Sequence, residues 1–473
     1  MMFGFLAGAT LAAVPATADN ADALLVDNVR LLDPAGDQPE VTEHGALLVQ
    51  DGRIVYAGPA EGFEAPDGAD RIDGSGLTVL PGLHDMHVHV WDEASLGAYL
   101  ASGITTVRNL SGMPFHLELA KRIDNGDLTG PRLLTSGPIL NSAGPNQQIN
   151  HQLVETASDA RAAVKAQAEA GYDRLKVYSN LKREPYEAVL DEAAMLGLRI
   201  TGHPVEGERL APQGDMQPFN IRFEEILDDG FETIEHTESI VWHAFGTEMQ
   251  REAGWSLAQR IAASGSAVTP TLVAHHNLVR VSQSEGDFAR REGVEKLNPV
   301  TQQLEAENIA FWAGRDPAAG ERADAVYADF TRMMHEAGVL LVTGSDAGIF
   351  ANIPGESLFD EMDLLVGAGI DPYEVIRMAT VNPAKVLGES GSSGCLQAGC
   401  SADVVLYACD PIPDVSCLRT PSAVIRSGKW LDRAALDALE ASASEHDPER
   451  TIRNLAEGMA AQGTPIDPAI FGN

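Results

Sequence analysis

The chain has 473 residues, of which 44% are hydrophobic and 22% are charged, values that are ordinary for a folded globular protein. Its formal net charge of −36 would repel nucleic acids and anionic lipid head groups, which argues against partners of either kind. The length suits one large domain together with a smaller one.

The first 18 residues have the pattern of a signal peptide. An apolar run from Met1 to Val14 is followed by Pro15 and the small-residue triplet Ala16-Thr17-Ala18, after which the chain turns polar. No Lys or Arg precedes the run, and the run is shorter than the roughly 20 apolar residues that a bilayer requires. We expect cleavage after Ala18, a periplasmic or secreted protein and no membrane insertion; a cytoplasmic protein is the alternative.

The two flanks of the chain, 19–80 and 389–432, show short apolar runs separated by Gly, Asp and Pro, a pattern typical of β-strands joined by tight turns. We predict that both flanks form one small β-sandwich. The predicted strands are Ala23–Leu31, Gly45–Gln50, Arg53–Ala57, Leu77–Leu80, Asp403–Tyr407 and Ala423–Trp430.

Residues 81–388 alternate apolar strands with helical stretches, as βα units do, and we predict a (β/α)8 TIM-type barrel with catalytic groups at the C-terminal strand ends. Ala274–Arg322 is expected to be a helical lid, and 433–473 a terminal helix and tail. Predicted helices include Asp159–Ala170, Glu184–Leu196 and Pro372–Leu387. The eight predicted strands are Gly82–His89, Gly103–Asn109, Arg132–Ser136, Asp173–Tyr178, Leu198–His203, Thr233–His236, Ser266–Thr271 and Val339–Asp346.

All four cysteines lie in one short C-terminal region. In an exported chain their even number predicts disulfides, most simply Cys395 with Cys400 and Cys409 with Cys417. A zinc knuckle is the rival interpretation, but the spacings lack the C-x2-C pairs that such sites usually show.

Residues that bind metals occur at the ends of the predicted strands. In Pro81–His89, His87 and His89 are two apart on a strand, so their side chains face the same side and can bind one cation. Further ligands are expected from four residues, each at the end of a later apolar strand: Lys176, His203, His236 and Asp346.

Charge balance explains why Lys176 could belong to such a set. A protonated lysine would be repelled by two dications, whereas a carbamate formed from the amine and carbon dioxide is an anionic bridging ligand. Together with Asp346 and a hydroxide it leaves a small positive charge, and a bound Zn²⁺ lowers the pKa of water to roughly 7. An ordinary salt-bridging lysine in a one-metal enzyme is the alternative for Lys176.

Several longer motifs resemble the amidohydrolase superfamily, closest to its imidazolonepropionase-like and prolidase-like branch, over about residues 20–430. The resemblance implies that His87, His89 and Asp346 bind one metal, that His203 and His236 bind the other, and that carboxylated Lys176 bridges them. It also implies that Asp346 moves a proton from the bridging hydroxide to the leaving amine. Beyond the ligands it rests on Gly103–Arg108, Gly130–Leu133, Glu356–Met362, Ala379–Ala384 and Gly399–Val405.

Two further residues are predicted to contact substrate. Tyr178 follows Lys176 by two positions and faces the same side, although a plain wall residue is the alternative. Arg108 could bind a substrate carboxylate in a bidentate manner or pair with an acidic neighbour.

The other polar residues near the motifs are predicted not to bind metal. His84 has the wrong parity and should pack, while Asp85 is either a support for the ligands or a buried hydrogen-bonded carboxylate. The remaining candidates are expected to be solvated loop histidines, the last two at the barrel mouth: His116, His151, His243, His275 and His276.

The sequence therefore predicts a hydrolase with two divalent metal ions, preferably Zn²⁺, that cleaves an amide bond in an X-Pro dipeptide or an N-acyl amino acid. A cyclic amidohydrolase, a deaminase acting on a ring C=N bond, and a lactonase or other esterase are the enzymatic alternatives. A non-catalytic scaffold is disfavoured because such proteins lose metal ligands and all six positions are filled here. A homo-oligomer is compatible with the sequence, which does not determine the oligomeric state.

Overall fold

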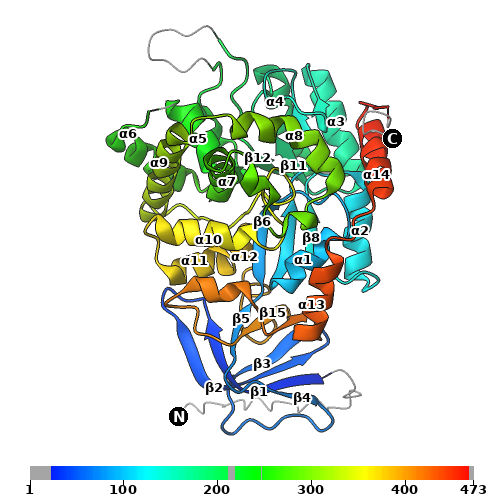
Figure 1. The fold of residues 1–473 in the computed structure, drawn as a ribbon, viewed down its shortest axis with the longest axis vertical. Helices are drawn as coiled ribbons and strands as arrows, with labels where there is room; N and C mark the ends of the chain where they lie inside the picture. Colours follow the sequence, from blue (N-terminus) through cyan, green and yellow to red (C-terminus); the bar gives the residue numbers. More distant parts are fainter. Residues whose placement is uncertain (1–22, 211–218, 247, 468–473) are drawn as a thin grey trace, which may run out of the picture.

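The computed structural model describes residues 23–210, 219–246 and 248–467 (Figure 1). The predicted signal peptide lies outside these residues. Within them, no helix combines the length and the apolar character needed to cross a bilayer.

Strands from both ends of the chain pair in one sheet, which lies at one end of the molecule in Figure 1. The joint is antiparallel, with β15 against β5, and the full order is β17-β16-β15-β5-β1-β2-β3 with β4 beside β1. The pairing of the two flanks that the sequence predicts is thus present. The strands are β1 (Ala23–Asp33), β2 (Glu40–Gln50), β3 (Arg53–Pro59), β4 (Asp70–Asp73), β5 (Thr78–Pro81), β15 (Val404–Tyr407), β16 (Ala423–Arg426) and β17 (Lys429–Asp432).

The sheet is apolar on both faces where the flanks meet. Val79 and Val404 belong to the core of the sheet, whereas their neighbours Leu80 and Val405 belong to the large core of the central domain. Successive strand residues point to opposite faces, so one face packs on the central domain. The strands form a single hydrogen-bonded sheet, which differs from the two facing layers of the predicted sandwich.

The predicted strand Ala423–Trp430 is in fact a hairpin. Ser427 and Gly428 have φ values of 51° and 80°, and β16 pairs with β17 on either side of them. Two consecutive positive φ values are what a two-residue hairpin turn requires, and they reverse the chain there.

Parallel strands make up the central domain. One sheet has the order β6-β7-β8 and the other the order β10-β9-β11-β12-β13-β14. Seven of the eight predicted barrel strands correspond to strands here, while β9 and β10 were not predicted. Their bounds are β6 (Leu83–Val88), β7 (Ile104–Asn109), β8 (Arg132–Thr135), β9 (Ile139–Asn141), β10 (His151–Leu153), β11 (Arg174–Val177), β12 (Arg199–Gly202), β13 (Phe231–Glu235) and β14 (Ala267–Thr269).

The eighth predicted strand, Val339–Asp346, is held by isolated pairings and has no regular ladder. Leu341 forms a parallel bridge with Val268 of β14, and Ala347 forms one with Val88 of β6. The N–H of Met86 donates to the carbonyl of Thr343 at 2.9 Å. This segment therefore connects the edge strands of the two parallel sheets.

The helices lie mostly between the parallel strands. The predicted helices at Asp159–Ala170 and Glu184–Leu196 correspond to α3 and α4, each ended by a left-handed glycine. The helices of this part are α1 (Ser95–Ala101), α2 (Pro114–Asp124), α3 (Ala157–Ala170), α4 (Arg183–Leu196), α5 (Thr237–Phe245), α6 (Arg251–Ser264), α10 (Ser357–Gly367), α11 (Pro372–Met378) and α12 (Val381–Val386).

The predicted helix Pro372–Leu387 is divided into α11 and α12. Pro383 has no N–H to donate to the carbonyl of Ala379, and a proline disfavours helical backbone before it. The freed carbonyl accepts the N–H of His84 at 2.8 Å instead. The break thus ties this segment to the start of β6.

The predicted lid and terminal helix consist of several helices. Within Ala274–Arg322 lie most of α7 (Leu272–Gln283), α8 (Pro299–Ala313) and the start of α9 (Pro317–Glu336). The chain ends in two helices, α13 (Arg433–Ser442) and α14 (Pro448–Ala461), because Asp447 caps a new helix with Pro448 in its first turn.

The four cysteines form two disulfides, Cys395 with Cys400 and Cys409 with Cys417, which confirms the predicted pairing and excludes the zinc knuckle. Cys395 and Cys400 are buried in the core of the sheet.

The joint between the flanks should contribute strongly to stability. Leu406 of β15 is fully buried in the core of the sheet, so Leu406→Ala should lower the free energy of unfolding by about 2–5 kcal/mol. Val55→Ala in β3, a half-exposed position of the same sheet, should cost no more than about 1 kcal/mol. Urea denaturation measures both, and equal losses would contradict this description of the core.

Candidate active site

The six predicted metal-binding residues line one cavity of about 600 Å³. His87 lies near the end of β6, Lys176 lies in β11, and His203 and His236 directly follow β12 and β13. His89 directly follows β6, and Asp346 ends the segment Val339–Asp346. The C-terminal strand ends therefore bring all six side chains to one place, as the sequence predicts.

Three of these residues form a compact group. The Nε2 atoms of His87 and His89 lie 3.4 and 2.9 Å from Oδ1 of Asp346. One ligand atom from each of the three lies within 4.8 Å of the others. This spacing suits three ligands of one cation.

The other three residues lie beside this group. The His236 ring centroid is 4.6 Å from that of His87 and 4.3 Å from that of His203. Nζ of Lys176 and Nδ1 of His203 are buried and have no hydrogen-bond partner among the described residues. A buried polar atom without a partner is costly, so this arrangement calls for a ligand.

The electrostatics of the cavity favour metal ligation. Burial, followed by the nearby Lys176, lowers the pKa of His87 to about 3, so its imidazole is neutral, the form that binds a cation. Burial also lowers the pKa of Lys176 to about 8. Neutral imidazoles, a weakly basic amine and a carboxylate fit divalent cations such as Zn²⁺.

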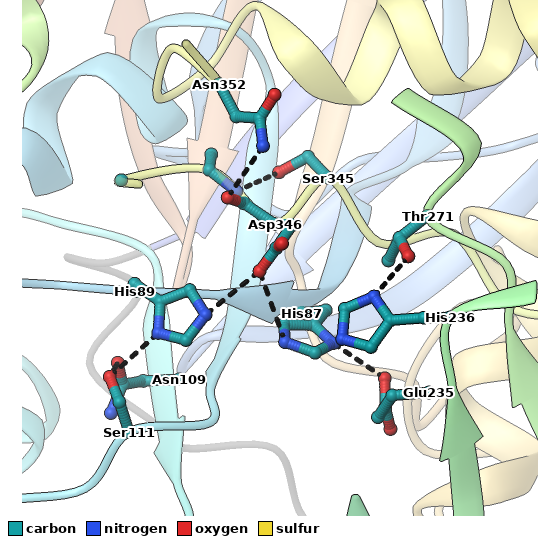
Figure 2. A network of polar contacts seen from close by, with 12 residues as sticks. His87, His89, Asn109, Ser111, Glu235, His236, Thr271, Ser345, Asp346 and Asn352 are labelled. Carbon is teal, nitrogen blue, oxygen red and sulfur yellow. Dashed lines mark hydrogen bonds and ion pairs between the residues drawn. The ribbon is translucent and has the colours of Figure 1, made fainter. Parts of the chain in front are cut away.

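Hydrogen bonds behind the ligands fix their rings (Figure 2). Nδ1 of His87 donates to Glu235 at 2.8 Å, leaving Nε2 toward Asp346. The Nδ1 atoms of His89 and His236 lie 2.9 and 2.6 Å from hydroxyls, those of Ser111 and Thr271 respectively. These partners were not predicted from the sequence; the one available signal was an acidic residue, Glu235, at the end of β13 next to His236.

Arg108 does not reach the cavity. It is fully buried, and its guanidinium donates to Glu235 and Glu232 at 3.0 Å each and to the carbonyl of Met86 at 2.8 Å. The predicted substrate contact is therefore wrong and the acidic pairing is right. Arg108 acts on the site through Glu235, which it holds against His87.

The backbone is constrained at two of the candidate ligands. His236 and Asp346 have φ values of 69° and 53°, a region that residues other than glycine rarely occupy. Such strain persists only where the surroundings enforce it, and it concentrates at functional sites. A side chain at Gly348, whose φ is 101°, would overlap the carbonyl oxygen of His89, so the loop after Asp346 requires glycine there.

Tyr178 lines the cavity beside His203, with ring centroids 3.9 Å apart, as a substrate-facing residue should. His84 is buried and packs, as predicted. Asp85 is a buried carboxylate that accepts the backbone N–H of Ser345 at 2.9 Å. It therefore also holds the backbone directly before Asp346.

Three of the five predicted solvated histidines are buried, and the other two are half-buried. His116 and His243 are buried against the carbonyls of Val90 and Ile221 at 2.6 and 2.8 Å, because their helices pack on the core. His151 is buried in β10, whose presence the sequence did not indicate. Half-buried His275 and His276 both bond to Asp324, and only His275 lines the cavity at its mouth.

The far wall of the cavity comes from distant parts of the chain. Helix α8 contributes Leu304, Glu305, Asn308 and Trp312, which places the predicted lid over the site. The terminal helix α14 contributes Leu455 and Met459, a role the sequence did not suggest.

Removing the carboxylate behind His87 should weaken metal binding. Glu235→Gln should reduce metal affinity about 10–100-fold because a neutral amide replaces the charged carboxylate that orients the ring of His87. Competition with a chelator measures this affinity. Glu232→Gln is the matched control, since Glu232 also pairs with Arg108 yet forms no hydrogen bond or ion pair with His87; an equal loss in both variants would contradict a specific role for Glu235.

Three similarities to known proteins bear on this site. A 5-methylthioadenosine/S-adenosylhomocysteine deaminase from Symbiobacterium thermophilum is 26% identical over 418 residues, which cover 79% of this chain and 82% of that protein. The structure of a bottromycin amidohydrolase has a TM-score of 0.69 at 25% identity and covers 94% of this chain and 95% of its own. A Xaa-Pro dipeptidase with bound methionine has a TM-score of 0.65 at 21% identity and covers 87% and 100%.

The model of the amidohydrolase family matches residues 78–431, a span that includes all six candidate ligands. Members of this family are hydrolases that act on carbon–nitrogen bonds of small molecules, generally with divalent metal ions. The resemblance seen in the sequence is confirmed, and the chain belongs to the amidohydrolase family.

Proposed function

We propose that the protein is a binuclear metal-dependent amidohydrolase that cleaves an amide bond in a dipeptide of the X-Pro type or in an N-acyl amino acid. The observation that carries this proposal is the buried Nζ of Lys176, which has no hydrogen-bond partner in the described chain and lies among four imidazoles and Asp346. A one-metal site would not need an amine at that position.

Each ligand has a role in this proposal. His87, His89 and Asp346 would hold one divalent cation, and His203 and His236 would hold the other. Lys176 would contact both as a carbamate: its neutral amine adds to carbon dioxide, a C–N bond forms, and one proton is released. Glu235, Ser111 and Thr271 would keep the imidazoles in the required orientation.

The chemistry requires a water, a polarised carbonyl and a proton carrier. Two bound divalent cations would supply an activated water and polarise the substrate carbonyl. Asp346 lies at the centre of the ligand group, where Oδ1 can accept a proton from the attacking water and deliver it to the departing nitrogen. The carbonyl carbon gains a C–O bond, the C–N bond breaks, and the amine leaves protonated.

The relatives favour an amide over the alternatives without deciding the substrate. The named dipeptidase and amidohydrolase have the same fold as this chain, whereas one curated relative, aligned over 79% of this chain, is a deaminase. We therefore retain deamination of a ring C=N bond as the second candidate. A screen of dipeptides and N-acyl amino acids with the zinc-loaded protein, alongside methylthioadenosine, separates the two by the product released.

The proposal also covers the closure of the parallel strands and the cellular location of the enzyme. Because Leu341 and Ala347 bridge to β14 and β6, we propose that the parallel strands close as a (β/α)8 barrel. We also propose export from the cytoplasm, and the two disulfides support an oxidising compartment.

Asp346→Asn should lower kcat by about 10²–10⁴-fold because the variant cannot carry the proton. Circular dichroism should be unchanged. The matched control Asp437→Asn, at an exposed position of α13, should retain the wild-type rate. A wild-type kcat in the Asp346→Asn enzyme would show that Asp346 is not the proton carrier.

Lys176→Met should reduce the bound metal from about two ions per chain to one or none, since the bridging ligand is lost. Metal analysis after gel filtration measures the ratio. Lys182→Met, which alters a surface lysine paired with Glu155, should leave it unchanged. A wild-type protein with only one ion per chain would favour the deaminase candidate.

A further inference from the structure

Helix α8 presents one acidic side chain to the cavity. The residues of α8 that line the cavity recur every three or four positions, so they form one face of the helix. Apart from Glu305 this face carries no charge, since its other members are Thr301, Leu304, Asn308 and Trp312.

Glu305 is fixed in place but lacks a cation. Its Oε2 accepts the backbone N–H of Phe350, in the loop that follows Asp346. No ion pair joins Glu305 to any Lys, Arg or His of the described residues. Burial, together with the charge of Asp346, raises the pKa of this carboxyl to about 8, as expected for a carboxyl group without a positive neighbour.

The rest of the cavity wall does not supply a positive charge near Glu305 either. Among the described residues that line it there is no Arg, and Lys176 is the single Lys, placed at the metal-binding end. Glu238 adds a second carboxylate that has no ion pair in the described chain. The surrounding surface is mostly apolar and includes Leu278, Trp312, Ile349, Phe350, Leu455 and Met459.

We propose that Glu305 is a specificity-determining residue that binds the free α-ammonium group of a dipeptide substrate. This inference rests on the proposed amide hydrolysis and narrows its substrate class. The ammonium donates to the Glu305 carboxylate while the Phe350 N–H holds the other oxygen, and the apolar wall receives the side chain of the N-terminal residue. An N-acyl amino acid, whose amide nitrogen belongs to the bond that is cleaved, has no ammonium group at that position and leaves Glu305 without a partner.

The selectivity should be large enough to measure. Hydrogen bonds to charged groups contribute about 1.5–3 kcal/mol, which corresponds to roughly a 10–100-fold difference in kcat/KM. The wild-type enzyme should therefore hydrolyse its best dipeptide, for instance L-leucyl-L-proline, at least tenfold more efficiently than the N-acetyl form of the same dipeptide.

The test compares the wild type with Glu305→Gln, which keeps the shape of the side chain and its acceptor for the Phe350 N–H. This variant should lose at least tenfold in kcat/KM for the free dipeptide and little for the acetylated one. Glu307→Gln, at an exposed position of the same helix outside the cavity wall, should behave as the wild type. Equal losses for both substrates in Glu305→Gln, or an unchanged selectivity ratio, would overturn the ammonium site.

A binding measurement separates this inference from the proposed reaction. By calorimetry, 3-methylbutylamine should bind the metal-loaded wild type at least tenfold more tightly than N-(3-methylbutyl)acetamide, and Glu305→Gln should abolish that difference. If no amide is hydrolysed while this difference holds, the proposed function fails and the cation site stands. If amides are hydrolysed but neither the amine nor the free dipeptide is preferred, the proposed function stands and the Glu305 assignment fails.

Discussion

The buried contact between Arg108, Glu235 and His87 is the interaction on which the arrangement of the site depends. Glu235 is fully buried, and burial alone would keep it protonated, but Arg108 at 3.0 Å and the neighbouring His87 outweigh this effect and lower its pKa. The ionised carboxylate then accepts the Nδ1 proton of His87, which leaves Nε2 free for a cation. Since Arg108 lies in β7 and Glu235 in β13, the two parallel sheets are linked at the point where the ligands converge.

Asp346 does not lie in a regular strand, so other hydrogen bonds position it. The backbone N–H of Asp346 donates to the carbonyl of His87 at 2.8 Å, and Asp85 accepts the N–H of Ser345. These bonds enforce the positive φ of Asp346, which an isolated loop would avoid. The carboxylate thus meets His87 and His89 because the first and last strand segments share hydrogen bonds, so the ligand group and the pairing between these segments depend on each other.

The parallel strands and the six candidate ligands that line the cavity could be predicted from the sequence because both follow local rules. Apolar runs ending in His, Lys or Asp mark strand ends, and the end of a parallel strand faces the same edge as its neighbours. The predictions from the sequence were wrong where a side chain's position depends on partners that are distant in the sequence. Arg108 has the same chemistry whether it meets a substrate or Glu232, and His116 looks like a loop residue until its helix is packed against Val90. The division between α11 and α12 was visible in Pro383, but the acceptor role of Ala379 toward His84 was not.

The wall of the cavity is built from segments that lie far apart in the sequence. The floor of the cavity comes from strand ends of the central domain, whereas its far wall combines α8 with α14, which lie more than one hundred residues apart in the chain and contact each other. Asn298, at the start of α8, donates to Thr451 of α14 at 2.9 Å, and Arg450 pairs with Asp92, which follows β6. The terminal helix is therefore bound both to α8 and to the segment that follows β6. Leu455 and Met459 of α14 line the cavity without belonging to the candidate ligand group, so a change in α14 would reshape the wall and leave those candidate ligands in place.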